Sequence, residues 1–361
     1  MKILLVNADS RWNIAIRRMY TYFTQQGHDV EMRDLKLSGY PHKRRVKIDA
    51  AAFDRVYVSN IFEHNADRVT VKNCHDVTYG GIGSRNPQLQ LPPEIEATAP
   101  YYAPEEKISY GFITRGCIRK CWFCKVPKYE GALKEYNPVQ SVVRGIPGEV
   151  VKFLDNNILA YPHHMEVFNW LIERGTRCEF NQGLDFRLVN DENLDALARL
   201  NYEGDYIFAF DDPRYQKLLD RKIVQIKQYI PKPWKLKFYI YYHPDMDLPQ
   251  LFDRVEWCRA HECKPYIMRD AACWGHNGEK FFIDYAAYCN QPGFFKNMTF
   301  AQFLDKRAAS GSISQERAKL HAMLYQIGRE KTEKRAKIYA AIEQMTQSSP
   351  ARNSELFNVK H

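Results

Sequence analysis

Three closely spaced cysteines are the residues of this chain best suited to chemistry. Cys117, Cys121 and Cys124 lie in a C-x3-C-x2-C pattern within the segment 111–131, GFITRGCIRKCWFCKVPKYEG. Three thiolates on one short loop can bind three irons of a four-iron cluster and leave the fourth iron open to another ligand. Structural zinc and unmetallated thiols are the competing interpretations. Structural zinc needs four protein ligands, however, and the nearest downstream histidine is His163.

Apolar segments recur at nearly constant intervals around and beyond this loop. Helix-like segments lie between them, for example 165–173, 192–200 and 247–261. A βα unit repeated six times predicts a partial (βα)6 TIM-type barrel over residues 105–275, with its active site at the carboxyl ends of the strands. The predicted strands are centred near Phe112, Val151, Phe180, Phe208, Phe238 and Ile267.

The first hundred residues predict a separate α/β domain. An apolar run at 3–6 precedes a helical pattern that ends near Gly27, and strand-like segments follow at 28–35 and 53–62. This order favours a doubly wound, flavodoxin- or Rossmann-like domain over residues 1–100, whose ligands would lie near 7–11 and 60–65. The proline-containing stretch 87–104 then reads as a linker.

Composition and charge limit the class of protein. The chain has 361 residues, nine cysteines and a net charge of +9, and it lacks the apolar run of about 18 residues that a membrane span needs. We therefore expect a cytoplasmic protein without membrane contact, whose cysteines are thiols or metal ligands. Residues 306–361 hold eleven Lys and Arg against five Asp and Glu, so a basic tail could contact nucleic acid.

The sequence of the C-terminal region 276–361 predicts aromatic packing followed by a helix. The segment 274–300, which overlaps its start, is rich in aromatic residues, and this favours packing over stacking of a planar substrate. A capping-box pattern at 312–315 then predicts the start of a basic helix. Its expected apolar face consists of Leu320, Met323, Leu324 and Ile327.

The cysteine loop, placed after a first barrel strand, resembles the signature of the radical S-adenosylmethionine (radical SAM) enzymes. The resemblance covers roughly residues 105–275. It implies that Cys117, Cys121 and Cys124 ligate a 4Fe-4S cluster, whose fourth iron is chelated by SAM, and that Phe123 packs near the adenine. It also implies that an electron, from a reductant such as flavodoxin or ferredoxin, cleaves SAM to methionine and a 5'-deoxyadenosyl radical.

Polar residues at the ends of the predicted strands agree with a zwitterionic cofactor at that edge. A single such residue can be a helix cap, but successive strands repeat the pattern. The segment 153–157, FLDNN, lies where the family binds the SAM amino group, although the glycines common in the family are missing. The candidate cofactor-binding residues are Phe123, Asp155, Asn156, Asn157, Asn181, Gln182, Arg187 and Asp211.

A first domain of this type is similar to that of two radical SAM subgroups. In cobalamin-binding members a histidine can ligate the metal, but here Arg11 stands at that position in the loop 9–14. Binding of cobalamin without a histidine ligand is still possible by this comparison. A cobalamin-dependent methyltransferase is therefore the alternative activity. Methylthiotransferases share Val126-Pro127 and Gly131, but they use three cysteines in the first domain, where this chain has only Cys74.

Two further alternatives follow from the sequence. The downstream cysteines could hold a second cluster, although buried thiols are the simpler interpretation; they are Cys258, Cys263, Cys273 and Cys289. The basic tail and Lys43-Arg44-Arg45-Lys47 favour a nucleic-acid base or nucleoside as substrate, with a peptide or metabolite as an alternative. A hypothesis of another class is a non-catalytic metal-binding nucleic-acid module.

Overall fold

The computed structural model describes residues 1–9, 12–37 and 45–330, and its larger sheets are parallel, as expected for an α/β fold. The chain divides into two compact units, 1–182 with 199–203, and 183–198 with 204 onward. The domain boundaries expected near 100 and 275 stay predictions. Within the described ranges, no helix is both long and apolar enough to cross a membrane.

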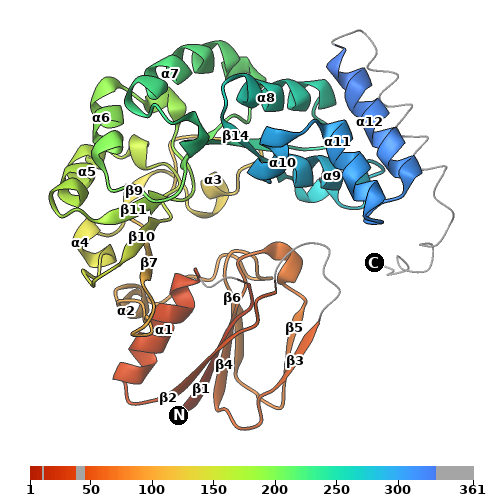
Figure 1. Cartoon of the computed structure of the whole chain (residues 1–361). Coiled ribbons are helices and arrows are strands. Elements are labelled where there is room, and N and C mark those ends of the chain that lie inside the picture. The colour runs from red at the N-terminus through yellow and green to blue at the C-terminus, as the bar shows by residue number, and fades with distance from the viewer. Residues whose placement is uncertain (10–11, 38–44, 331–361) are drawn as a thin grey trace. The chain divides into compact units, whose positions relative to one another are not determined.

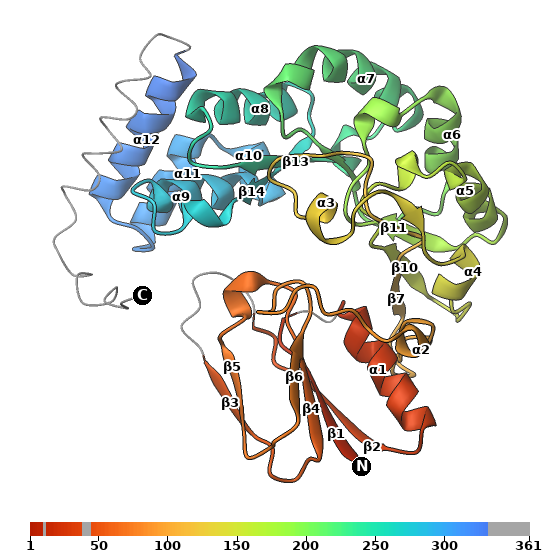
Figure 2. The same ribbon diagram turned by 180° about the vertical axis from the view of Figure 1, so that it is seen from behind.

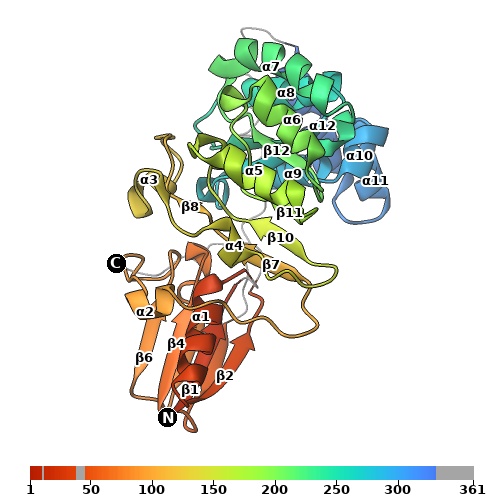
Figure 3. The ribbon, with the colours of Figure 1, turned by 90° about the vertical axis from the view of Figure 1, so that its left-hand side faces the viewer.

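The first unit contains an N-terminal sheet built around one apolar strand. Strand β1 (Lys2–Asn7) lies between β2 (Asp29–Asp34) and β4 (Arg55–Ser59), and β6 (Val77–Gly80) pairs with β4 (Figures 1 and 3). All three pairings are parallel. Because side chains alternate along a strand, the continuous apolar run of β1 supplies both faces of the sheet with buried residues.

The two faces of this sheet are covered differently. Helix α1 (Ile14–Gln25) packs on one face, and the parallel pair β3 (Val46–Asp49) and β5 (Val69–Lys72) lies on the other (Figures 1 and 2). The doubly wound expectation, with helices on both faces, is therefore wrong for the described residues. The physical reason lies in the short segments around Val46 and Val69, where apolar and polar residues alternate with the period of a strand.

The predicted linker at 87–104 is packed against the domain. It contains the short helix α2 (Pro93–Glu96), with proline at a helix start, where its missing N–H costs nothing. Ile95 is 5% exposed and belongs to the core beneath α1. The clustered prolines restrict the backbone of this segment, and the segment nevertheless buries Ile95 in the core.

A second parallel sheet of the first unit carries the cysteine loop. Its order is β11-β10-β7, and each pairing is parallel. The strands are β7 (Ile108–Gly111), β10 (Val150–Phe153) and β11 (Arg177–Phe180). The other elements of this part are β8 (Thr114–Arg115), α3 (Val126–Tyr129), β9 (Lys134–Glu135), α4 (Val139–Val142) and α5 (His164–Glu173).

The second unit contains a third parallel sheet, in the order β12-β13-β14. Its strands are β12 (Tyr206–Ala209), β13 (Leu236–Tyr242) and β14 (Lys264–Arg269), and its helices include α6 (Asp191–Arg199), α7 (Gln216–Tyr229) and α8 (Leu248–Ala260). The sequence prediction is confirmed for five of the six strands, which include their predicted centres; the first, β7, ends one residue before Phe112. The three predicted helices are also confirmed, with ends that differ by one residue or less.

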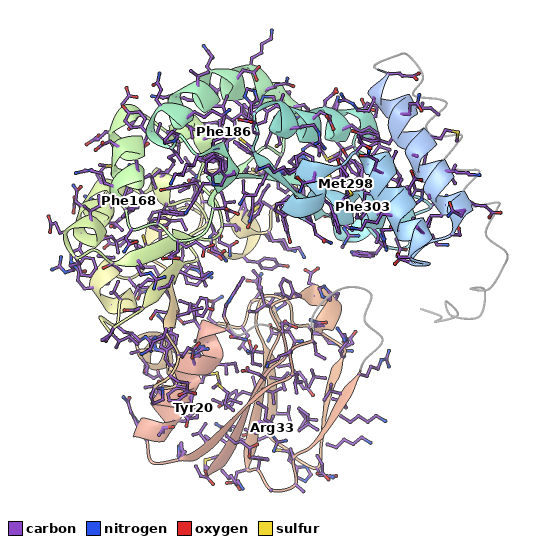
Figure 4. The ribbon with its side chains drawn as sticks, in the orientation of Figure 1. Tyr20, Arg33, Phe168, Phe186, Met298 and Phe303 are labelled. Carbon is purple, nitrogen blue, oxygen red and sulfur yellow. The ribbon has the colours of Figure 1, made fainter. Side chains whose placement is uncertain are left out.

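The aromatic-rich segment forms the core of a helical layer within the second unit. Its helices are α9 (Glu279–Cys289), α10 (Pro292–Asn297), α11 (Phe300–Ala309) and α12 (Gln315–Arg329). Tyr285 and Phe300 are each 1% exposed and pack edge to face at 5.1 Å, and Phe303 (Figure 4) packs against Phe300. The expectation of packing is therefore confirmed.

The start of the last helix differs from its prediction. Helix α12 is capped by Ser314, which accepts a hydrogen bond from the Arg317 N–H, and not by Ser312. A capping box is present instead at α11, between Thr299 and Gln302. The expected apolar face is shifted too, since Met323 is 44% exposed. The buried positions of α12 are Ala318, His321, Leu324 and Gly328.

Candidate functional site

The cysteine loop is closed at its base by backbone pairing. Strands β8 and β9 pair antiparallel, and the Cys117 N–H donates to the Gly131 carbonyl at 3.2 Å. Gly116 has a φ of +79°, and a Cβ at this position would lie 2.1 Å from the Ala132 oxygen. Only glycine fits that place. Residues 117–131 therefore form one closed loop that carries all three cysteines.

None of the three loop cysteines forms a disulfide, and each has intermediate exposure. The Cys117 sulfur accepts a hydrogen bond from the Arg119 N–H at 3.4 Å, and the Cys124 N–H donates to the Cys121 carbonyl at 3.0 Å. Trp122 is 70% exposed, and Phe123 packs edge-on against it at 5.7 Å. Solvent can therefore reach the loop, as loading with metal requires.

The cysteine loop has suitable donor atoms for a metal centre but not a preformed metal-binding geometry. Within residues 1–9, 12–37 and 45–330, no group of three or more His, Cys, Asp or Glu side chains is arranged to hold a metal ion, and this includes the loop cysteines. The donor chemistry fits an iron–sulfur cluster nonetheless, because three soft thiol ligands without disulfides share one loop. What fits is thus the set of donors and their loop, and not a preformed cage.

Asp155 anchors the polypeptide just before the cysteine loop. It is 2% exposed, and its carboxylate accepts hydrogen bonds from the Ile113 N–H at 3.0 Å and from the Thr114 N–H and hydroxyl at 2.6 and 2.8 Å. These bonds favour the charged form, but burial outweighs them and raises the pKa of Asp155 to about 6. Its carboxylate thus joins the end of β10 to the segment after β7.

Glu130 and Asn156 hold the base of the same loop. The Glu130 carboxylate accepts hydrogen bonds from the Gly116 N–H at 2.9 Å and from Asn156 Nδ2 at 2.8 Å, and it pairs with Arg115 at 3.0 Å. Sequence reasoning did not identify Glu130, because a glutamate near the end of a four-residue helix has no distinctive pattern. Asn156, predicted to bind the cofactor, contacts the loop itself.

The strand register brings other predicted residues to the same edge of the sheet. Phe153 is paired with Gly111 on one side and Phe180 on the other, so the three strands end together. The segments that follow, 155–157 and 181–182, therefore leave the sheet on the side of the cysteine loop. Asn157 is 3% exposed, Asn181 is half-buried and Gln182 is exposed. Their cofactor role stays a prediction.

The raised pKa of Asp155 gives a pH prediction. Between about pH 4 and 6 the folded chain holds a proton on Asp155 that the unfolded chain has lost, so this residue's contribution to stability falls as pH rises through that window. Lowering the pH from 7 to 5 should therefore stabilise the wild type relative to Asp155→Asn, measured as slower hydrogen–deuterium exchange at 113–114. As a control, the exposed Asp29→Asn should show the same change of exchange with pH as the wild type. Equal changes in the wild type and in Asp155→Asn would contradict the prediction.

Arg187 and Asp211 lie in the second unit, at the carboxyl edge of its sheet. Arg187 pairs with Asp185 at 2.6 Å and lies over the Tyr215 ring, 4.9 Å from its centroid. Asp211 accepts a hydrogen bond from the Tyr241 N–H at 2.7 Å, and burial raises the pKa of this carboxyl to about 6. Both side chains therefore have protein partners within their own unit.

Arg254 of α8 organises that edge and was missed by sequence reasoning. It is 0% exposed and donates, at 3.0 Å each, to the carbonyls of Phe210, Asp211 and Tyr241. Burial lowers the pKa of Arg254 to about 10. A usable signal was present in the sequence, because Arg254 stands within the apolar stripe of α8, where a charged residue needs buried partners.

The polar residues at the carboxyl edge of the N-terminal sheet bind one another. Asn7 donates to Asp34 at 2.7 Å, and Asn13 donates to Ser59 at 2.8 Å. Asp9 accepts hydrogen bonds from the Ile61 and Phe62 N–H groups at 2.5 and 3.0 Å. This network occupies groups that a ligand at 7–9 and 60–65 would use. Arg11, which stands at the cobalamin-histidine position, lies outside the described residues.

The downstream cysteines are buried thiols. They are at most 3% exposed, and burial raises the pKa of Cys263 and Cys273 to about 12. They are Cys258, Cys263, Cys273 and Cys289. Their burial favours the interpretation that they are buried thiols and not ligands of a second cluster. Of the basic segments, 331–361 and the Lys43-Arg44 pair lie outside the described residues.

Comparisons with known proteins do not assign this chain to a family. The sequence matches no family model and has no significant match among curated proteins. Function is therefore argued from the loop and the sheet edge that carries it.

Proposed function

We propose that the chain is a radical SAM enzyme that binds a 4Fe-4S cluster through Cys117, Cys121 and Cys124. The observation that carries the proposal is one closed loop with three partly exposed cysteines outside any disulfide, placed directly after a strand of a parallel sheet. When bound, such a cluster would supply the electron that cleaves SAM to methionine and a 5'-deoxyadenosyl radical.

Within this proposal the residues near the loop have distinct tasks. Asp155 positions the start of the loop through the Ile113 and Thr114 N–H groups, and Asn156 positions its base through Glu130. Asn157, Asn181 and Gln182 are candidates for the amino and carboxylate groups of SAM, because they follow strands that end beside the loop. Phe123 is the candidate contact for the adenine.

The proposal includes a partial barrel and a substrate class. The sequence pattern of six βα segments, whose strands form two three-stranded parallel sheets, is the basis for proposing a (βα)6 barrel over residues 105–275, with Arg187 and Asp211 as further candidate cofactor residues. A nucleic-acid base or nucleoside is the proposed substrate class because the chain carries a net charge of +9, much of it in the tail. A flavodoxin or ferredoxin would serve as reductant.

The decisive experiment is a SAM-cleavage assay under anaerobic conditions. The full chain is reconstituted with iron and sulfide, reduced with dithionite and mixed with SAM, and 5'-deoxyadenosine is measured by mass spectrometry. We expect deoxyadenosine to form, together with SAM binding in a parallel titration. A stable metal centre without SAM binding would overturn the proposal and favour a metal-binding nucleic-acid module. Bound cobalamin, sought in the same sample, would favour the methyltransferase alternative.

A further inference from the structure

The outer face of the cysteine loop carries a large aromatic ring among cations. Trp122 is 70% exposed, whereas tryptophan is on average a well-buried residue. Residues 117–129 contain four Lys and Arg and no Asp or Glu. The exposed side chains of this stretch are all apolar or positively charged. They form the loop face, which consists of Ile118, Lys120, Trp122, Lys125 and Lys128.

A second exposed aromatic surface adjoins the loop face. Phe62 is 49% exposed, and its ring stacks on that of His64, with centroids 5.5 Å apart and an angle of 15° between the rings. Glu63, which lies between them in the sequence, pairs with Lys125. This ion pair joins the segment 62–64 to the cysteine loop within the first unit. Exposed rings from two segments therefore flank one ion pair.

The carboxylates that adjoin the loop face are paired within the protein. Glu130 pairs with Arg115 at 3.0 Å, and Glu63 pairs with Lys125. The exposed Glu135 lies beyond the loop, on β9. Because the two ion pairs are neutral overall, the other two lysines leave the loop face with a positive charge. The charge of this surface therefore suits an anionic partner.

Exposed rings among lysines suit single-stranded nucleic acid better than other anions. Lysines neutralise its phosphates, and its unpaired bases stack on aromatic side chains. A base in a duplex already stacks between its neighbours, so a duplex offers phosphates but no open base face. An inorganic anion would use the charges and leave the rings in water. The loop face therefore fits a strand that presents phosphates and unstacked bases together.

We propose that the loop face binds single-stranded nucleic acid, with one base stacked on Trp122 and phosphates bound by Lys120 and Lys128. Base faces and phosphates are common to DNA and RNA, so single strands of both should bind. This binding would give the substrate class of the proposed enzyme a place on the chain, but it needs neither iron nor SAM. Its failure and a failure of SAM cleavage are therefore distinguishable.

The test is fluorescence anisotropy of the full chain, without added iron, with labelled oligothymidylate of about eight nucleotides, a length that one single-strand-binding domain covers. An abasic strand of the same length keeps the phosphates and lacks the bases. Loss of one stacked base costs roughly fivefold to 150-fold, so the abasic strand should bind at least about fivefold more weakly. Oligouridylate should bind like oligothymidylate, and a duplex should bind more weakly. Binding of only one of the two single strands, equal binding of the abasic strand or the duplex, or no binding at all would each overturn the proposal.

Two variants locate the binding. Trp122→Ala should weaken binding of oligothymidylate by roughly fivefold to 150-fold, and it should fold because the ring is mostly in solvent. The control Trp234→Ala removes a ring that is 57% exposed in the second unit, and it should leave the affinity unchanged. Lys120→Gln should reduce the magnitude of the slope of log K against log salt by about 0.7. Its control, Lys217→Gln at an exposed position of α7, should leave the slope unchanged.

The same variants separate this surface from other binding sites and other partners. Unchanged affinity in Trp122→Ala, or equal losses in Trp122→Ala and Trp234→Ala, would place the binding elsewhere and overturn the proposal. If oligothymidylate does not bind, and flavodoxin binds the wild type but not Trp122→Ala, the loop face is a docking surface for the reductant and the proposal is wrong. Oligonucleotide binding that depends on Trp122, without SAM cleavage, would support this proposal and overturn only the enzyme assignment.

Discussion

Cys121→Ala should abolish formation of 5'-deoxyadenosine by the anaerobically reconstituted chain. Loss of groups that only support metal ligands typically costs 10- to 100-fold, so loss of a ligand should cost more than roughly 100-fold. The same variant should bind less iron and lose the brown colour of the reconstituted protein. The assay is product formation by mass spectrometry, alongside iron content and the visible absorption spectrum.

Cys74→Ala is the matched control for this result. Cys74 likewise has intermediate exposure and forms no disulfide, but it lies beside the N-terminal sheet, where its sulfur contacts the carbonyls of Asp54 and Asp76. It should retain both the colour and the activity of the wild type. If Cys121→Ala stays brown and active, or if Cys74→Ala fails equally, the assignment of the cluster to the loop is wrong.

Arg254→Met is expected to destabilise the carboxyl edge of the second unit's sheet by about 3–5 kcal/mol. The methionine keeps most of the volume of the side chain, but it leaves three carbonyls without the donor that now serves them. Because the chain has two compact units, a single unfolding midpoint would mix them. Hydrogen–deuterium exchange of β12 and β13 measures the local effect directly.

The exposed Arg221 on α7 provides a control for the charge change. Arg221→Met removes the same positive charge from the surface, so exchange in β12 and β13 should stay that of the wild type. If Arg254→Met exchanges like the wild type as well, the three carbonyl contacts contribute little to stability. The loss of protection should be largest at 236–242, since Tyr241 is both a partner of Arg254 and a residue of that strand.

The parts of the fold that could be predicted are those whose residues determine local structure by themselves. The strands β10–β14 are short segments that are mostly apolar or, as in β11, alternate apolar and charged residues, and each is bounded by turns or by a helix. The cysteine loop could also be located, because metal-ligand spacing is a local property of the sequence. The start of α12 was misplaced by two residues, since Ser312 and Ser314 are both chemically suitable caps.

What could not be predicted depends on contacts between segments distant in the sequence. The alternation at 46–49 and 69–72 indicates strands, but nothing local shows that this pair of strands covers the second face of the N-terminal sheet. Asp155 was predicted to bind the cofactor because it follows a strand, and that role stays a prediction, whereas its hydrogen bonds to residues 41 and 42 positions earlier in the chain could not be predicted. Arg254 likewise reaches back 44 residues to Phe210. Such partners are chosen by tertiary packing, which overrides local propensity.

The bonds at the base of the cysteine loop determine how the protein could mature. They join Asp155 to Ile113 and Thr114, and Glu130 to Gly116, without any contribution from iron. Small zinc domains, by contrast, are unfolded until metal arrives. If the loop binds the proposed cluster, a newly synthesised chain would therefore have the base of the loop in place before the cluster is inserted. On that proposal, protein made without iron would be folded at this loop and could take up its cluster when iron is supplied.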